Sequence, residues 1–105
     1  MTHSPDEEKW IISNRAHILG VLSGALGEMI RNNVERGEVA KDKEDAWIGM
    51  YSNAHTLAID EIIRTEPSRL NKQLTPKEAK AVGDEVSRRA TEFLKEAVRV
   101  MSQRN

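Results

Sequence analysis

The chain has 105 residues, with 16 lysines and arginines against 17 aspartates and glutamates, and it has no cysteine. This near balance gives no bulk field toward nucleic acid or an anionic membrane. The lack of cysteine excludes a disulfide framework, a thiolate zinc site and a thiol nucleophile, and fits a reducing cytoplasm. The acidic start MTHSPDEEK has no signal-peptide core, and the apolar stretches are too short to span a bilayer. Leu, Ile, Val and Phe total only 23, so a single domain of this size is marginal alone and favours help from a partner subunit.

Start and stop signals divide the chain into three helices, over about residues 5–36, 43–65 and 76–103. Ser4, Pro5 and Glu7 form a capping box with proline at the first helical position, and Gly37 supplies the stop. The second helix begins near Asp42 and ends before Pro67. The sequence TPKE at 75–78 repeats the logic of the first start, and no segment alternates as a strand does. Because the connections are short, neighbouring helices should run antiparallel.

These signals predict one all-α domain over residues 1–105, an elongated bundle of three long antiparallel helices that is completed by homo-oligomerisation. Each helix has one apolar face at helical spacing. The face of the first helix holds Ile11, Ile18, Leu19, Leu22, Ala25, Leu26, Met29 and Ile30. The face of the second holds Trp47, Tyr51, Ala54, Ala58 and Ile62, with Met50, Leu57, Ile48 and Ile59 at its margins. The face of the third holds Ala79, Val82, Val86, Ala90, Phe93, Leu94, Ala97, Val100 and Met101.

The stretch GVLSGALG, residues 20–27, puts three glycines into one helix, although each costs roughly 1 kcal/mol relative to alanine. They lie on the side of the first helix opposite its apolar face, in a strip of small residues: Ser13, Ala16, Gly20, Ser23, Gly24 and Gly27. Small residues four apart let two helix backbones approach closely. The strip therefore predicts self-association, by default as a two-fold homodimer. The alternatives are a kink at the glycines, or a strip that is open to solvent or faces a loop of the same chain.

Four polar side chains, Arg15, Tyr51, His55 and Glu61, fall on or beside the apolar faces of the first two helices. A buried charge needs a partner, so the structural interpretation is an Arg15–Glu61 ion pair beside a buried His55 imidazole. The functional interpretation is a polar pocket of these four residues that sequesters a small anion or a nucleotide, with arginine as the bidentate donor.

Other chemistries have less support. The histidines, His3, His17 and His55, lack the spacing of a helical metal site, so we expect no metal and no cofactor. No serine has a histidine at a useful spacing and no phosphate-binding loop occurs, so we expect no enzymatic activity. A basic line on the third helix (Lys77, Arg88, Lys95 and Arg99) offers a weak contact with a nucleic-acid backbone. Acidic residues interleave with it at spacings of three and four, which indicates intrahelical ion pairs and disfavours nucleic acid.

Chains of this type, small, charged, helical and without catalytic signatures, are typical of accessory proteins from bacteria or their phages. We therefore expect a non-enzymatic interaction or regulatory protein, an adaptor or an inhibitor, that acts as a homo-oligomer by binding another macromolecule. The ligand-sequestering pocket and weak nucleic-acid binding remain the alternatives.

Overall fold

The computed structural model describes residues 4–103, without the side chains at positions 97, 98 and 101–103. Its elements are α1 (Pro5–Glu35), a 3₁₀ turn η1 (Lys41–Lys43), α2 (Glu44–Thr65), a second 3₁₀ turn η2 (Pro67–Arg69) and α3 (Pro76–Gln103). The described part of the chain contains no strand. The predicted all-α fold of three helices is confirmed, and each predicted helix boundary lies within one residue of the observed one.

The helix ends follow the predicted chemistry with one exception. Backbone N–H groups of Glu7 and Glu78 donate to the hydroxyls of Ser4 and Thr75, at 3.2 and 3.1 Å, and both glutamates accept the reciprocal bond of a capping box. Gly37 ends α1 with a φ of +76°, where a side chain would be strained. The exception is Asp42, which lies inside η1, so α2 begins at Glu44 without a side-chain cap.

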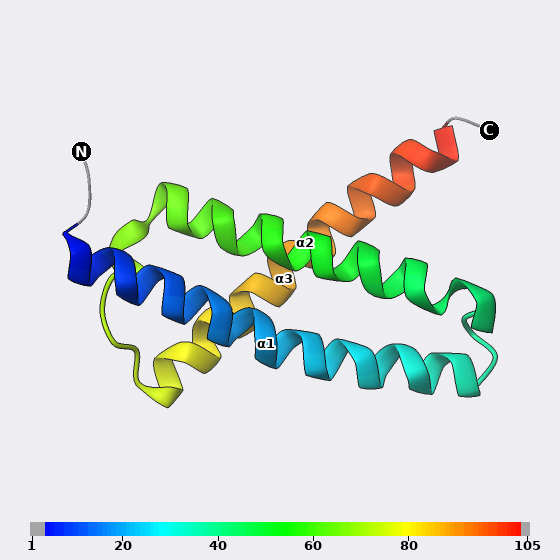
Figure 1. The fold of residues 1–105 in the computed structure, drawn as a ribbon. Helices are drawn as coiled ribbons and strands as arrows, with labels where there is room; N and C mark the ends of the chain where they lie inside the picture. Colours follow the sequence, from blue (N-terminus) through cyan, green and yellow to red (C-terminus); the bar gives the residue numbers. More distant parts are fainter. Residues whose placement is uncertain (1–3, 104–105) are drawn as a thin grey trace.

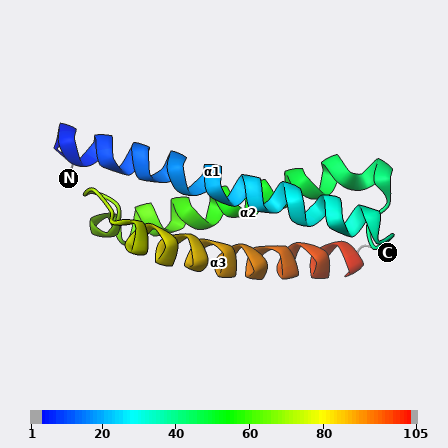
Figure 2. The ribbon, with the colours of Figure 1, turned by 90° about the horizontal axis from the view of Figure 1, so that it is seen from below.

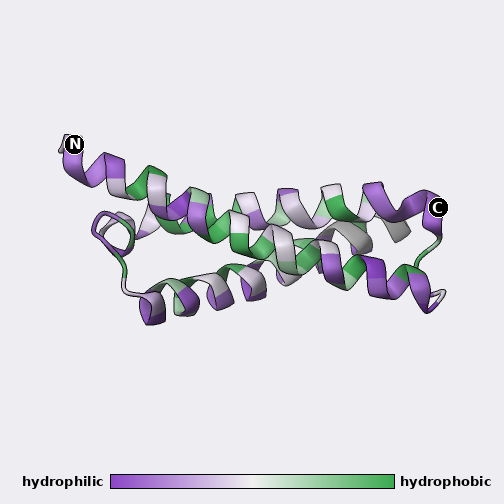
Figure 3. Cartoon of the chain, turned by 60° about the horizontal axis from the view of Figure 1, so that its bottom comes forward, coloured by the Kyte–Doolittle hydropathy of each residue, from purple (hydrophilic) through white to green (hydrophobic). Residues whose placement is uncertain are grey.

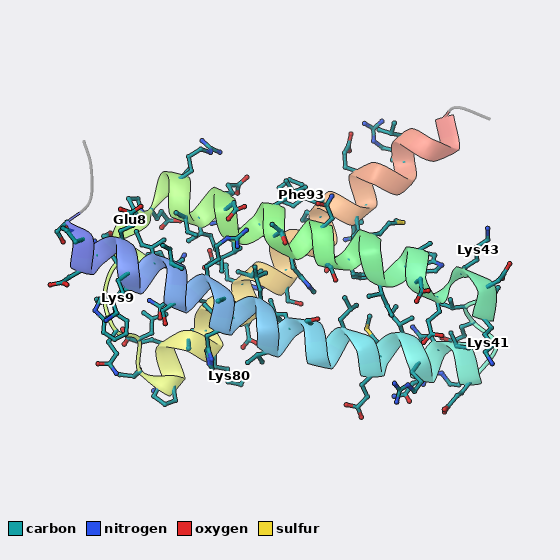
Figure 4. All side chains as sticks on the ribbon, viewed as in Figure 1. Glu8, Lys9, Lys41, Lys43, Lys80 and Phe93 are labelled. Carbon is teal, nitrogen blue, oxygen red and sulfur yellow. The ribbon has the colours of Figure 1, made fainter. Side chains whose placement is uncertain are left out.

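The helices form two layers (Figures 1 and 2). Helices α1 and α2 lie side by side and antiparallel in one layer, and α3 crosses them obliquely in the other. Figure 4 shows Lys80 beyond the edge of α1 and Phe93 beyond the edge of α2, so the two ends of α3 emerge on opposite sides. The molecule measures 47 × 29 × 18 Å, and its radius of gyration of 15.7 Å exceeds the roughly 13 Å typical of a compact chain of this length.

One apolar core forms where all three helices cross, and Figure 3 shows the apolar residues concentrated toward the middle of the bundle. Its buried members are Ile11, Ile18, Ala54, Ala58, Ile59, Ile62, Leu70, Val82, Val86 and Ala90. Leu26 and Ile30 are also buried but lie outside this cluster.

Part of the predicted apolar faces is not in the core. Ala25, Met29, Phe93 and Val100 are exposed, because the oblique path of α3 carries it away from the far half of the hairpin. Ala97 and Met101, also expected on the α3 face, lie outside the described side chains.

A polar contact that the sequence analysis missed holds the long connection between α2 and α3. Asn14, buried on the apolar side of α1, donates from Nδ2 to the backbone carbonyl oxygens of Leu70 and Lys72, both at 2.8 Å. The Nδ2 of Asn71 donates to Glu7 at 2.7 Å. The connection is thus tied to the first turns of α1, and Leu70 is fully buried as a result.

Candidate functional site

The seam between α1 and α2 carries the candidate site, and an ion pair fixes its register. Arg15 of α1 contacts Asp60 of α2, with Nε and Oδ1 2.7 Å apart. Because the helices are antiparallel, each turn forward on α1 is matched by a turn backward on α2. This register sets Gly20 opposite His55, and Ser23 opposite Ser52.

A hollow of about 300 Å³ lies along this seam and is lined by α1 and α2 only. We call it the outer seam hollow; its lining residues are Leu19, Gly20, Ser23, Ser52, His55 and Thr56. A side chain placed at Gly20 would meet no atom within 4 Å, so the missing side chain of this glycine contributes to the open space. The Thr56 hydroxyl donates to the Ser52 carbonyl oxygen at 3.1 Å.

A second hollow of about 260 Å³ lies between all three helices, and we call it the inner hollow. Its lining is mainly apolar, with hydroxyls from Tyr51, Ser87 and Thr91; the full set is Leu22, Ala25, Leu26, Met29, Tyr51, His55, Ser87, Ala90 and Thr91. Among the described side chains, His55 alone lines both hollows, and no lining side chain of either hollow carries a formal charge at neutral pH.

His55 is a buried histidine without a hydrogen-bond partner among the described residues. It is only 7% exposed, and burial lowers the pKa of its imidazole, because the charged form is deprived of water. Its ring makes no hydrogen bond with any residue in the described range. Every fully shielded side-chain nitrogen or oxygen in that range has a partner, so the unpartnered ring nitrogens keep some solvent contact, and the hollows are the spaces beside them.

The structure does not assemble the predicted four-residue pocket. Tyr51 and His55 line the inner hollow together, as the prediction required. The expected Arg15–Glu61 pair is wrong, because Arg15 binds Asp60 while Glu61 binds Arg89 of α3. The two residues face different neighbours, since Asp60 lies on the α1 side of α2 and Glu61 on the α3 side.

Arg89 belongs to a charged cluster that the sequence analysis did not predict. Glu85 accepts a hydrogen bond from Arg69 at 2.8 Å and forms an ion pair with Arg89 at 2.9 Å, and Glu66 lies beside both arginines. The hydrogen bond from Arg69, and then the charges of both arginines, lower the pKa of the Glu85 carboxyl. The cluster joins the end of α2, η2 and α3, so it is a structural clamp at the start of the connection. The i,i+4 spacing of Glu85 and Arg89 was the sequence signal available for it.

The strip of small residues lies outside the core. Ser13, Ala16, Gly20, Ser23 and Gly24 are exposed and Gly27 is half-buried. No atom lies within 4 Å of a side chain built at any of the three glycines. The helix α1 continues without interruption through the glycines. Gly20 and Ser23 border the outer seam hollow, whereas self-association through the strip stays a prediction.

A different surface is apolar and uncovered. On α3, Phe93 is 36% exposed and Val100 is 39% exposed; on the hairpin, Leu57 is 48% exposed and Met29 is 41% exposed. Phe93 borders a hollow of about 380 Å³ between α2 and α3, together with Glu61 and Arg89. We call these four exposed apolar side chains, which come from all three helices, the crossing surface.

Half of the basic line of α3 is paired with neighbouring acidic residues. Lys95 binds Glu92 at 3.6 Å and Arg99 binds Glu96, whereas Lys77 and Arg88 form no ion pair with the described residues. Lys80, outside the line, binds Asp84 at 3.0 Å. Among the described residues there is no cluster of histidine and carboxylate side chains able to hold a metal ion. His3 lies outside the described residues. No helix in the described range has the length and hydropathy needed to cross a membrane.

Comparisons with other proteins add no assignment. The chain matches no protein-family model, no curated protein sequence and no solved structure.

Proposed function

We propose that this protein is a small non-enzymatic binding protein whose first partner is a second copy of itself. The observation that carries the proposal is a mismatch in the single chain. The amphipathic helix α3 runs on past the hairpin with Phe93 and Val100 exposed, while the far half of the hairpin lacks a third helix.

The uncovered half of the hairpin and the protruding half of α3 could cover each other in a dimer. The far half of the hairpin is a two-helix layer that begins beyond Met29, which is 41% exposed at the border of the inner hollow. The protruding half of α3 is about 20 Å of helix with an apolar face. A second copy, rotated by a half-turn about an axis normal to the α1–α2 layer, would lay its α3 across the open hairpin of the first. The exchange is reciprocal, so the arrangement closes as a dimer with the same surface on both subunits.

Composition and shape support this reading. A chain with so few large apolar residues buries little core alone, and its radius of gyration is larger than that of a compact domain. Covering the exposed apolar side chains of both copies would add roughly 25 cal/mol for each Å² removed from water. Our expectation of a cytoplasmic adaptor or inhibitor that binds a further macromolecule rests on the sequence alone.

A pair of matched substitutions tests the proposed dimer. Phe93→Ser removes the aromatic side chain of the crossing surface, and Ile12→Ser removes another large apolar side chain, which is 63% exposed on α1. We expect Phe93→Ser to weaken the dimer by at least about tenfold, the equivalent of 1.4 kcal/mol, with Ile12→Ser close to wild type. Equal effects of the two variants on the dimer dissociation constant, measured by sedimentation, would contradict the proposal.

A further inference from the structure

A second property, independent of the dimer, follows from His55. Buried polar side chains are nearly always hydrogen-bonded within their own protein or to ordered water. His55 is more than nine-tenths buried, yet no described residue partners its ring. A neutral imidazole offers one donor and one acceptor, so the ring is equipped to bind a molecule that supplies both.

The outer seam hollow surrounds this ring with matching groups. Ser23 and Ser52 place hydroxyls in its lining, and neither hydroxyl is bonded to a described residue. The Thr56 hydroxyl donates its proton to the Ser52 carbonyl oxygen and keeps its lone pairs free to accept. Three residues with hydroxyls and one histidine thus line a space beside Gly20.

Charge decides the class of ligand. None of the six lining residues carries a formal charge at neutral pH, and the nearest ion pair on the seam, Arg15–Asp60, is satisfied internally. A charged ligand would lose water without gaining a counter-ion, which is costly. An uncharged ligand with adjacent donor and acceptor groups loses far less. A hollow of about 300 Å³ lies at the small end of ligand pockets, so it suits a single ring.

We propose that the outer seam hollow binds a small uncharged amide or heteroaromatic base, with His55 as the hydrogen-bonding group on its floor. The proposed site shares His55 with the ligand pocket that the sequence predicted. It differs in that the ligand is neutral instead of anionic, and in that Arg15 and Glu61 lie outside the site.

The test uses the full-length chain labelled with ¹³C and ¹⁵N, and three neutral probes: nicotinamide, adenine and uracil. Nicotinate, the anionic counterpart of nicotinamide, is the matched charged probe. We expect at least one neutral probe to shift the ring resonances of His55 saturably, and nicotinate to bind at least about tenfold more weakly. Absence of any His55 shift with all three neutral probes, or equal binding of nicotinate and nicotinamide, would overturn the proposal.

Substitutions at the hollow locate the site. Gly20→Leu fills the outer seam hollow and should abolish binding, without loss of melting temperature, because leucine favours helix more than glycine does and meets no clash there. Gly49→Leu is the control, since this α2 glycine is equally open but lines neither hollow. Ser52→Ala should weaken binding about two- to tenfold, the effect of one hydrogen bond. Loss of binding in Ser87→Leu, which fills the inner hollow, with Gly20→Leu unaffected, would show that the assignment to the outer hollow is wrong.

Discussion

Asn14 and Leu70 are 56 residues apart in the chain, yet the Asn14 side-chain amide donates to the Leu70 carbonyl oxygen at 2.8 Å. The same nitrogen reaches the carbonyl oxygen of Lys72. Both carbonyls belong to the connection that leads into α3, so this one side chain positions the connection on α1.

Replacing Asn14 with leucine should therefore destabilise the fold. The substitution leaves two carbonyl oxygens of the connection without their donor, and a buried unsatisfied group costs about 1–3 kcal/mol. Urea denaturation followed by circular dichroism measures the change in unfolding free energy. The control is Asn32→Leu, an exposed asparagine of the same helix, which should stay within about 0.5 kcal/mol of wild type. Equal stability of the two variants would show that Asn14 does not hold the connection.

His55 makes stability depend on pH. Its pKa in the folded chain lies below the ordinary 6.5 because burial disfavours the charged ring, so the unfolded chain binds more protons in that range. Stability should be constant above the unfolded pKa and should fall as the pH drops from about 6.5 through the lower folded pKa.

The measurement is a series of urea midpoints between neutral and mildly acidic pH, for the wild type and for His55→Gln. Glutamine cannot titrate, so its midpoint should change less across this range. If both proteins lost stability in parallel, His55 would not be the group responsible.

Glu85 makes stability depend on pH in a second, more acidic range. The Arg69 hydrogen bond lowers the pKa of this carboxyl below 4.5, so its contribution is present above that pH and is lost as the pH falls through the folded pKa. Glu85→Gln should destabilise the protein by about 0.5–1.5 kcal/mol at neutral pH, because the cluster loses a charge-assisted partner that is partly exposed.

A double-mutant cycle with Arg69→Met checks this contribution. The combined change should be smaller than the sum of the single changes, because both substitutions remove the same interaction. Additive effects would mean that Arg69 and Glu85 are not coupled in solution.

Gly24→Leu distinguishes the two candidate self-association surfaces. A side chain at Gly24 meets no atom of its own chain, and leucine is about 1 kcal/mol better than glycine in a helix. If the dimer forms through the crossing surface, the variant should melt at a higher temperature and keep the wild-type mass in light scattering. A dimer that Gly24→Leu dissociates would instead place the interface at the strip of small residues, as the sequence alone predicted.

Local signals were sufficient to predict the helices. The capping boxes at Ser4 and Thr75 and the stop at Gly37 depend on neighbouring residues, so their pattern is readable in sequence. The path of α3 was not readable, because the apolar periodicity of α3 identifies its inward face but not its crossing angle. For this reason the sequence analysis placed Phe93 and Met29 in the core, whereas both side chains are exposed in the structure.

The candidate site was predicted only in part for the same reason. A histidine among apolar residues indicated burial, and His55 is buried. The partner of Arg15 depends on the rotation of α2, and adjacent residues of one helix point about 100° apart. Asp60 rather than Glu61 therefore meets Arg15, a distinction that periodicity alone did not reveal.

The most direct test of the central claim, that the crossing surface joins two copies of this chain, is sedimentation equilibrium of the wild-type protein over a range of concentrations. Self-association predicts a mass that rises to twice the chain mass of 11.9 kDa. A mass that stays at 11.9 kDa up to the highest concentration would contradict the claim, since the exposed face of α3 would then have no second copy to cover it.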